Sequence, residues 1–457
     1  MDTLPNSLSA RDIAALVHPQ TNLKRHEDLG PLVFESGKGV WLRDEDGNEY
    51  LDVMSGLWCA SLGYSSPRLA QVASAQMEKM AYSHLYKHRS HSPAVELAEK
   101  LLSIAPADMA KVHFQNSGSE ANDVAIKLAW YYFDAIGKPE KRKIISRHGA
   151  YHGSSVATVS LTGKPDMHVG FNLPLDGFLH TDQPYAYRDA KEEESPEAYA
   201  SRLAESLEEL IVHEGAETVA AFFAEPVMGS SGAIAPPATY FEKVQDVLKR
   251  HKVLFIADEV ITGFGRTGNM WGSETFKLKP DMLTCAKALS AGALPISALM
   301  MSDRVYQALR LQSEKLGSYA HGHTYAGHPA CAAVALETLR IYDEMDLPNL
   351  ARQLGRELER VLRPLEDHPL IGAVEVNGFM AGIEIAENKE LRKPFPAEMQ
   401  ITAQIEKAAA HEGLIVKSIG SRICLAPAYV ISAKELGQAG ERLLKALDSV
   451  AEEHGLA

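Results

Sequence analysis

Two acidic residues end an apolar run in the middle of the chain, and a glycine-rich string follows them. In VLFIADEVITGFGRTG (253–268), Asp258 and Glu259 come after the run, and 263–268 spell G-x-G-x-x-G. A dinucleotide-binding turn needs its first glycine directly after the strand and a helix directly after the third. Here five residues, 258–262, separate the run from the first glycine, and the residues that follow lack helical periodicity. We interpret the glycines as a tight surface loop.

The position of Asp258 has a functional and a structural interpretation. In open α/β sheets, ligands bind just beyond the carboxyl ends of the strands, and Asp258 is expected there. Strand-end acids are also often structural, as caps or members of ion pairs. Two further stretches favour the functional interpretation.

The first of these stretches is HFQNSGSEAND (113–123), in which an apolar strand runs into Ser117-Gly118-Ser119 and a helix opens at Glu120. Free backbone N–H groups and the helix dipole make such a turn an anion site. Serine hydroxyls add donors, and glycine lets the backbone approach the anion closely. An ordinary serine-capped helix is the structural alternative.

The second stretch is DMLTCAKALSAG (281–292), in which Lys287 follows an apolar strand among small residues. Poor solvation lowers the pKa of a lysine and makes it a usable amine nucleophile. A lysine that reaches solvent past the strand end is the alternative. Together, an anion cup, a strand-end aspartate and a strand-end lysine form the set that pyridoxal 5'-phosphate requires. The lysine would hold the aldehyde, and the aspartate would keep the pyridine nitrogen protonated.

The elements around these residues alternate between strand and helix, which predicts an α/β domain with a mainly parallel sheet. Short apolar runs, as expected of strands buried on both faces, occur at 111–115, 143–147, 219–227, 253–257 and 296–301. Helices are expected at 119–137 and 195–215, and a hairpin at 40–53. Amphipathic helices after about residue 340 indicate a smaller α+β domain.

Composition excludes several classes of protein. A formal charge of −14, without a basic block, argues against nucleic-acid binding. No apolar run reaches the length of a membrane span, and the N-terminus lacks the pattern of a signal peptide. Four scattered cysteines predict neither disulfides nor a zinc site, so a cytoplasmic protein is expected. His84, His88 and His91 would share one face of a helix, but no acid or cysteine accompanies them, and no metal is predicted.

The chain resembles the class III aminotransferases of the fold type I group, and within them the ω-amino acid (amine):pyruvate enzymes. The resemblance rests on NSGSEAN (116–122), AYHGSS (150–155), ADEVITGFGRTG (257–268), CAKALS (285–290) and HTYAGHP (323–329). VHPQTN (17–22), GNEYLD (47–52) and AEP (224–226) extend it over nearly the whole chain. It implies a large domain at 71–335 with a seven-stranded sheet, and a small domain built from 1–70 and 336–457.

The resemblance also implies residue roles. Lys287 would form the Schiff base and shuttle a proton, Asp258 would pair with the pyridinium nitrogen, and Ser117, Gly118 and Ser119 would hold the phosphate. Tyr151 would stack on the cofactor ring, followed by His152, and Glu225 would hydrogen-bond near it. Trp58 would form a wall of the substrate pocket. Thr324 would reach the phosphate of a neighbouring subunit, so a homodimer with shared active sites is expected, and pairing of dimers into tetramers stays open.

One position departs from the pattern. Pyruvate-using members carry a mobile arginine shortly before an Ala-Pro-Pro segment, and Lys417 stands at that position in LIVKSIGSRICLAPAYV (414–430). Lysine provides a point charge and not a bidentate fork, so it holds a carboxylate less specifically. Arg422 is either a substitute or a surface residue. The expected function is transfer of an amino group from a primary amine or ω-amino acid to a keto acid such as pyruvate. Alternatives are a taurine, diamine or 2-oxoglutarate transaminase, or a decarboxylase or aminomutase on the same fold.

Overall fold

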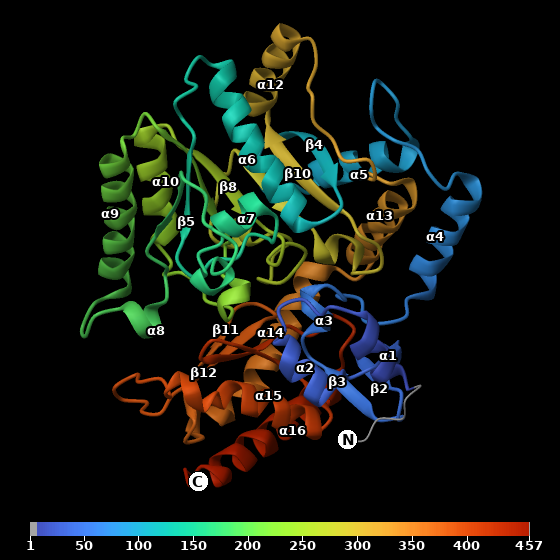
Figure 1. Cartoon of the computed structure of the whole chain (residues 1–457), viewed down its shortest axis with the longest axis vertical. Coiled ribbons are helices and arrows are strands. Elements are labelled where there is room, and N and C mark those ends of the chain that lie inside the picture. Colours follow the sequence, from blue (N-terminus) through green and yellow to red (C-terminus); the bar gives the residue numbers. More distant parts are fainter. Residues whose placement is uncertain (1–6, 457) are drawn as a thin grey trace.

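A seven-stranded sheet forms the centre of the upper part of the molecule in the computed structural model, which describes residues 7–456 (Figure 1). Its strand order is β4-β10-β9-β8-β7-β5-β6. The strands are β4 (Met109–Gln115), β5 (Lys143–Arg147), β6 (Phe178–Thr181), β7 (Val219–Ala224), β8 (Leu254–Asp258), β9 (Met282–Cys285) and β10 (Ser297–Ser302). Only β10 is antiparallel to its neighbours, β4 and β9. The predicted mainly parallel sheet is confirmed.

Helices cover both faces of this sheet. On β7, Phe222 and Ala224 pack toward the face covered by α5, α9, α10 and α13, whereas Ala221 and Phe223 pack toward α6 and α12. Burial on both faces explains why these strands read as continuous apolar runs in the sequence. The helices of this part are α4 (Pro67–Lys79), α5 (Ser92–Ser103), α6 (Gly118–Ala135), α7 (Val156–Leu161), α8 (Ala186–Asp189), α9 (Pro196–Glu214), α10 (Tyr240–His251), α11 (Gly272–Thr275), α12 (Asp303–Leu316) and α13 (Pro329–Glu344).

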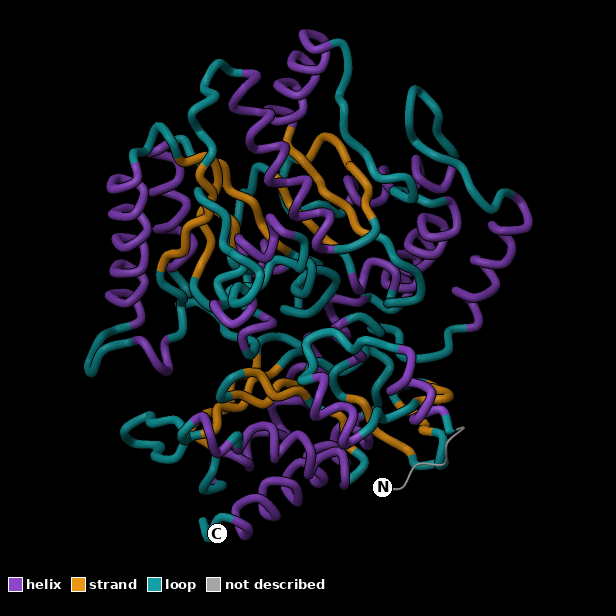
Figure 2. The backbone as a smooth tube through the Cα atoms, in the orientation of Figure 1, coloured by secondary structure: helices purple, strands orange, loops and turns teal. Residues whose placement is uncertain are grey.

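The lower part of the molecule joins the two ends of the chain (Figures 1 and 2). One sheet contains β1 (Phe34–Lys38), β2 (Trp41–Asp44), β3 (Glu49–Asp52) and the C-terminal β13 (Leu414–Ile415), which pairs in parallel with β3. A second sheet has the order β11-β12-β15-β14 and contains β11 (Ile371–Val376), β12 (Ala381–Ile385), β14 (Lys417–Ile419) and β15 (Arg422–Leu425). Residues 1–6 and 457 of the predicted small domain lie outside the described residues.

Six α-helices pack around these two sheets. They are α1 (Leu8–Ala15), α2 (Leu23–Leu29), α3 (Ser55–Trp58), α14 (Leu347–Leu362), α15 (Ile401–His411) and α16 (Ala433–Glu453). Short 3-10 turns complete the chain at η1 (Pro165–Met167), η2 (Gly229–Ser231), η3 (Lys287–Ser290), η4 (Arg363–Asp367) and η5 (Ala397–Met399). None of the helices in residues 7–456 is both long and apolar enough to cross a membrane.

Candidate active site

Asp258 ends β8 and lies in the interior, where its carboxylate is held from two sides. Asn122 Nδ2 on α6 donates to Oδ2 at 2.7 Å, and His152 Nδ1 lies 2.8 Å from the same oxygen. The other oxygen, Oδ1, accepts the backbone N–H of Val260 at 3.0 Å. Asn122 is fixed in turn because its side-chain oxygen accepts a hydrogen bond from Thr284 Oγ1 at 2.7 Å. The carboxylate is therefore fixed in position without an arginine or lysine partner among the described residues.

Glu225 extends this network past His152. Its Oε2 lies 3.7 Å from His152 Nε2 and accepts from the buried Arg147 Nη2 at 2.9 Å. Its other oxygen accepts the backbone N–H of Tyr151 at 3.1 Å. Although burial opposes ionisation, the neighbouring His152 and Arg147 side chains hold the pKa of Glu225 below its ordinary value. A continuous polar chain thus joins the ends of β5, β7 and β8.

Lys287 opens η3, directly after β9, where the backbone adopts a left-handed φ of 48°. Such a conformation is uncommon for a residue with a side chain and is found preferentially at functional sites. In residues 7–456 the Lys287 ammonium has no hydrogen-bond or ion-pair partner, and burial lowers its pKa. The Asp258 carboxylate and the Cys59 thiol act on it in the opposite direction. An unpaired amine with a lowered pKa is available as a nucleophile and as a base.

The turn after β4 presents the predicted anion cup. Ser117 caps α6 by accepting from the backbone N–H of Glu120 at 3.2 Å, and Ser119 Oγ accepts the N–H of Ser154 at 3.0 Å. Gly118 lies over Val260, where an added Cβ would come within 3.0 Å of a methyl carbon. The first turn of α6 therefore lies against the segment that begins at Asp258, because Gly118 approaches Val260 and Asn122 contacts the Asp258 carboxylate.

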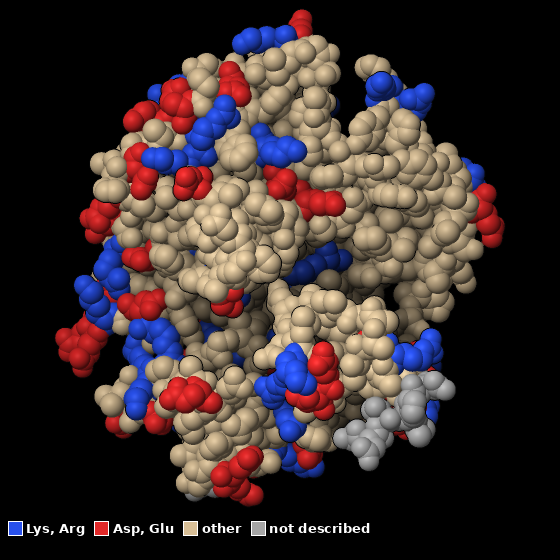
Figure 3. All heavy atoms as spheres, viewed as in Figure 1, with Lys and Arg blue, Asp and Glu red and all other residues tan. Residues whose placement is uncertain are grey.

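Two aromatic residues line the region around these groups. Trp58, at the end of α3, is buried with Val227, Ile261, Met380 and Cys424. Tyr151 is half-buried, its hydroxyl lies 3.0 Å from Ser154 Oγ, and the Lys164 Nζ lies 6.0 Å from its ring centre. The surface is hollowed between the upper and lower parts of the molecule, with a basic side chain visible inside (Figure 3).

Glu259, the second acid of the pair, is structural. Its buried carboxylate accepts the N–H of Gly272 at 3.0 Å and the hydroxyl of Ser273 at 2.6 Å, and Thr262 also donates to it. Glu259 thereby fixes the glycine-rich loop to α11. The loop has the expected tight turns, but the prediction that it lies on the surface is wrong, because 263–266 are buried.

The physical reason for this burial is Arg266. Its Nη2 donates to Ser55 Oγ at 2.8 Å in the N-terminal segment, and its Nη1 donates to the carbonyl of Pro427 at 2.6 Å in the C-terminal segment. Gly265, with a φ of 96°, turns the chain so that the guanidinium reaches both. The glycines position an arginine that links three parts of the chain, and they form no nucleotide site.

Lys417 and Arg422 lie on neighbouring strands but differ in their surroundings. Lys417 is partly exposed and its Nζ lies 3.2 Å from Glu406 Oε1. Arg422 is 1% exposed, so the alternative of a surface residue is wrong. Its Nη2 donates to Glu375 at 2.8 Å and to the carbonyl of Gly382 at 2.9 Å. The guanidinium can be buried because the carboxylates of Glu375 and Glu384 compensate its charge.

Other predicted positions are distributed differently. Thr324 is exposed in the loop after α12, where its carbonyl accepts from Tyr82 Oη at 2.9 Å, and no described contact joins it to Ser117–Ser119. His84, His88 and His91 share no helical face, because the chain is not helical at 84–90 and His91 caps α5. Sequence reasoning missed Asn122 and Arg147, which contact Asp258 and Glu225. Asn122 stood inside the quoted NSGSEAN stretch, whereas nothing singled out Arg147.

Comparisons with known proteins identify the family of the chain. The family model for class III aminotransferases matches residues 23–447. The chain is 44% identical over 442 residues to a chloroplastic gamma aminobutyrate transaminase 3 of Solanum lycopersicum, covering 95% of this chain and 85% of that protein. The chain therefore belongs to the class III aminotransferases. It is a pyridoxal 5'-phosphate-dependent transaminase, and its small-molecule substrates are an amine and a keto acid.

Solved structures give the same fold. The omega transaminase of Pseudomonas jessenii in complex with PMP has a TM-score of 0.97 and 44% identity, covering 99% of this chain and all of that one. A transaminase with L-ala has a TM-score of 0.91 and 46% identity, covering 93% of this chain and all of that one.

The residues present fit pyridoxal phosphate. Lys287 is an unpaired amine, and Asp258 is a buried carboxylate that lacks a lysine or arginine counter-ion in the described part of the chain. The buried Nε2 of His152 has no hydrogen-bond partner there either. The exposed Ser117, at the start of a long helix, suits a phosphate group.

Proposed function

We propose that this transaminase moves an amino group from a primary amine or an ω-amino acid to pyruvate by a ping-pong mechanism. The observation that carries the proposal is an unpaired Lys287 beside the fixed Asp258 carboxylate. The gamma aminobutyrate transaminase relative supports an ω-amino acid as donor, and the neighbour described with L-ala supports the alanine–pyruvate pair.

Each residue then has a defined task. Bound pyridoxal phosphate supplies the electron sink for the reaction. Lys287 would remove a proton from the carbon that bears the amino group and return it later, since burial lowers its pKa and so favours the neutral amine. Asp258 keeps the pyridine nitrogen protonated, and Asn122 and His152 fix the direction of its carboxylate. Tyr151 would stack on the ring, Ser117, Gly118 and Ser119 would bind the phosphate, and Glu225 would orient His152.

The keto-acid carboxylate is bound by Lys417. Trp58 and Cys424 share one apolar cluster, and Lys417 lies directly opposite Cys424 in the β14–β15 register, which puts the two on the same face of the sheet. Glu406 competes for the ammonium, so an acceptor must displace an internal partner. Arg422 is the weaker candidate, because Glu375 and Gly382 already accept from it.

The site is completed in a homodimer. Thr324 is exposed, and residues on both sides of it, 317–323 and Ala326, help to line a groove of about 1320 Å³ that a second copy would cover. Thr324 of one subunit then reaches the phosphate of its partner. Pairing of dimers into tetramers is left to measurement.

The cytoplasm is the proposed location. All four cysteines are free in the described residues, which suits a reducing compartment. Fractionation of cells that express the untagged protein tests this, since the gamma aminobutyrate transaminase relative is named as chloroplastic.

A titration of the cofactor-loaded enzyme tests the function. Addition of an amine or ω-amino acid should abolish the visible absorbance band of the bound cofactor, and pyruvate should restore it. Lys287→Ala, as control, should show neither change. Recovery with 2-oxoglutarate but not pyruvate would overturn the acceptor, and loss of the band with release of carbon dioxide would indicate decarboxylation.

A further inference from the structure

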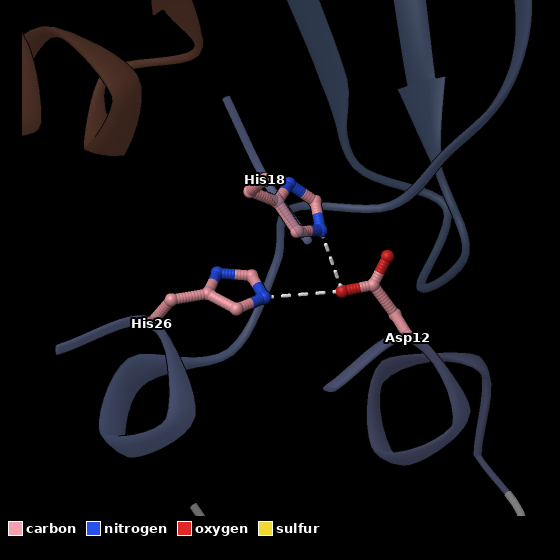
Figure 4. A group of neighbouring side chains, drawn as sticks. All are labelled: Asp12, His18 and His26. Carbon is pink, nitrogen blue, oxygen red and sulfur yellow. Dashed lines mark hydrogen bonds and ion pairs between the residues drawn. The ribbon is translucent and has the colours of Figure 1, made fainter. Parts of the chain in front are cut away.

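Three side chains converge at the N-terminal end of the molecule, outside the active site. Asp12 lies on α1, His26 lies on α2, and His18 lies in the segment between them (Figure 4). The Nε2 atom of His18 is 2.8 Å from Asp12 Oδ1, and the Nε2 atom of His26 is 3.1 Å from the same oxygen. The two imidazole rings are 4.1 Å apart at their centres.

This arrangement is that of a metal site with two imidazoles and one carboxylate. Their ligand atoms all lie within 4.8 Å of one another. A tetrahedral zinc ion binds such donors at about 2.0–2.2 Å, which separates neighbouring donor atoms by about 3.3 Å. The two observed separations from Oδ1 are close to this value, so small side-chain movements would admit an ion. Imidazole and carboxylate donors suit zinc and its first-row neighbours.

The surroundings also suit an exchangeable ion. The side chains of Asp12, His18 and His26 are 15%, 30% and 11% exposed, so solvent reaches the cluster and can supply a fourth ligand. In residues 7–456 Asp12 pairs with no lysine or arginine, and its ion-pair partners are the two histidines. A metal cation would therefore lie beside a carboxylate that no lysine or arginine of the described chain neutralises.

The local fold gives such an ion a structural role. Helices α1 and α2 have eight and seven residues, and neither contains a buried residue. Helices this short are marginal in water without tertiary contacts. Besides the cluster, α1 and α2 meet at Gly30, where an added Cβ would come within 2.9 Å of Ser9 Oγ.

We propose that Asp12, His18 and His26 form a binding site for a zinc-class divalent ion that clips the two N-terminal helices together. The class III match begins at residue 23, so two of the three ligands precede it. The spacing Asp-x5-His-x7-His matches no familiar metal-binding motif, so nothing in the sequence singled out these three residues. The ligands meet only through the packing of α1 against α2.

Metal titration of the tag-free, cofactor-loaded enzyme tests the proposal. After treatment with a chelator, the protein should bind one Zn²⁺ per chain in a calorimeter, and Co²⁺ should give the visible bands of a low-coordinate site. His18→Gln, His26→Gln and Asp12→Asn should each weaken this binding by more than about tenfold, because even outer partners of a metal typically contribute 10- to 100-fold.

A matched control separates this site from adventitious binding. His213 is an exposed histidine whose Nδ1 lies 3.6 Å from Glu214, and His213→Gln should leave Zn²⁺ binding unchanged. Unchanged visible absorbance of the bound cofactor shows that each variant is folded. Zn²⁺ binding that is absent from the parent enzyme, or equal in the parent and the three ligand variants, would overturn the proposal.

Discussion

Two neighbouring carboxylates show how contacts assign different tasks to identical chemistry. Asp258 faces Asn122 and His152, whereas Glu259 accepts only from the loop and helix that follow it. Burial raises the pKa of Glu259, and its hydrogen bonds only partly offset this effect. The position of Asp258 at the end of a strand can be read from the sequence. The structural role of Glu259 cannot, because its partners Gly272 and Ser273 lie further along the chain.

Asp258→Asn should slow transfer from the amine by at least about 100-fold, the effect typical of removing one preorganised electrostatic partner in an active site. The rate is measured as loss of the cofactor band in a single half-reaction. Glu259→Gln is the matched control and should mainly lower the free energy of unfolding. Equal slowing by both substitutions would contradict the division of roles.

Asn122→Ala should reduce both activity and stability. It removes the donor to Asp258 and leaves the Thr284 hydroxyl without its acceptor, which costs about 1–3 kcal/mol in a buried site. Urea unfolding gives the stability, and the pH profile of the half-reaction reports the changed environment of Asp258. A loss of stability with an unaltered profile would show that Asn122 only supports the fold.

Glu406→Gln should strengthen acceptor binding, because it releases Lys417 from its internal partner. Exposed ion pairs contribute at most about 1 kcal/mol, so the KM for pyruvate should fall by no more than about fivefold. Lys417→Ala should raise that KM, while the exposed Lys407→Ala should leave it unchanged. An unchanged KM in both Glu406→Gln and Lys417→Ala would exclude Lys417 from the acceptor site.

At the scale of elements, periodicity and end signals predicted most of the framework. Helix α9 begins after Ser195 and ends before Gly215, as its cap and terminal glycine indicate. The five predicted strand stretches all form strands, and the 40–53 hairpin is present as β2 and β3. The apolar strand expected before Lys287 is β9, whereas β6 was not predicted, because only its first two residues, Phe178 and Leu179, are apolar.

The start of α16 provides a test with a pH dependence. Glu435 accepts from Ser432 N at 2.8 Å and from Trp41 Nε1 at 2.7 Å, so it both caps the helix and links it to β2. Partial burial acts against ionisation, but these hydrogen bonds hold the pKa of Glu435 below its ordinary value. A depressed carboxyl pKa stabilises the fold above the unfolded pKa, and this stabilisation is lost as the pH falls through the folded pKa.

Glu435→Gln should therefore lower the free energy of unfolding by about 1 kcal/mol at pH 7, the usual contribution of one cap or hydrogen bond. The difference from the parent should shrink between about pH 5 and pH 3. Urea unfolding at pH 7 and at pH 3 measures this difference in the free energy of unfolding, with the exposed Glu441→Gln as control. A difference that stays constant down to pH 3 would contradict the role of the charge.

At the scale of the whole molecule, the contacts between distant segments were the least predictable part. Arg266 stands in a string that resembles a nucleotide-binding motif, yet it links Ser55 and Pro427. Arg147 reaches Glu225 only because β5 and β7 are neighbours in the sheet. The order of the strands in the sheet depends on the packing of all the helices, so it cannot be predicted from short local sequence patterns.

Arg266→Met should lower the free energy of unfolding by about 3 kcal/mol or more, since hydrogen bonds to a buried charged group contribute about 1.5–3 kcal/mol each. The Arg266 side chain links the N-terminal and C-terminal segments to the loop after β8. Its loss should therefore also make limited proteolysis faster. Arg250→Met, which breaks an exposed pair with Glu208, should change stability by at most about 1 kcal/mol. Similar losses in both variants would argue against Arg266 as a link.

The parallel pairing of β3 with β13 has a consequence for synthesis on the ribosome. β3 forms near the start of the chain, but its neighbour at Leu414–Ile415 is translated only after every strand of the seven-stranded sheet. The nascent N-terminal hairpin must therefore keep an open edge throughout elongation, exposed to chaperones and to other nascent chains. Translation past Ile415 closes that edge, so translational pauses between the codons for β3 and those for β13 would prolong the vulnerable period.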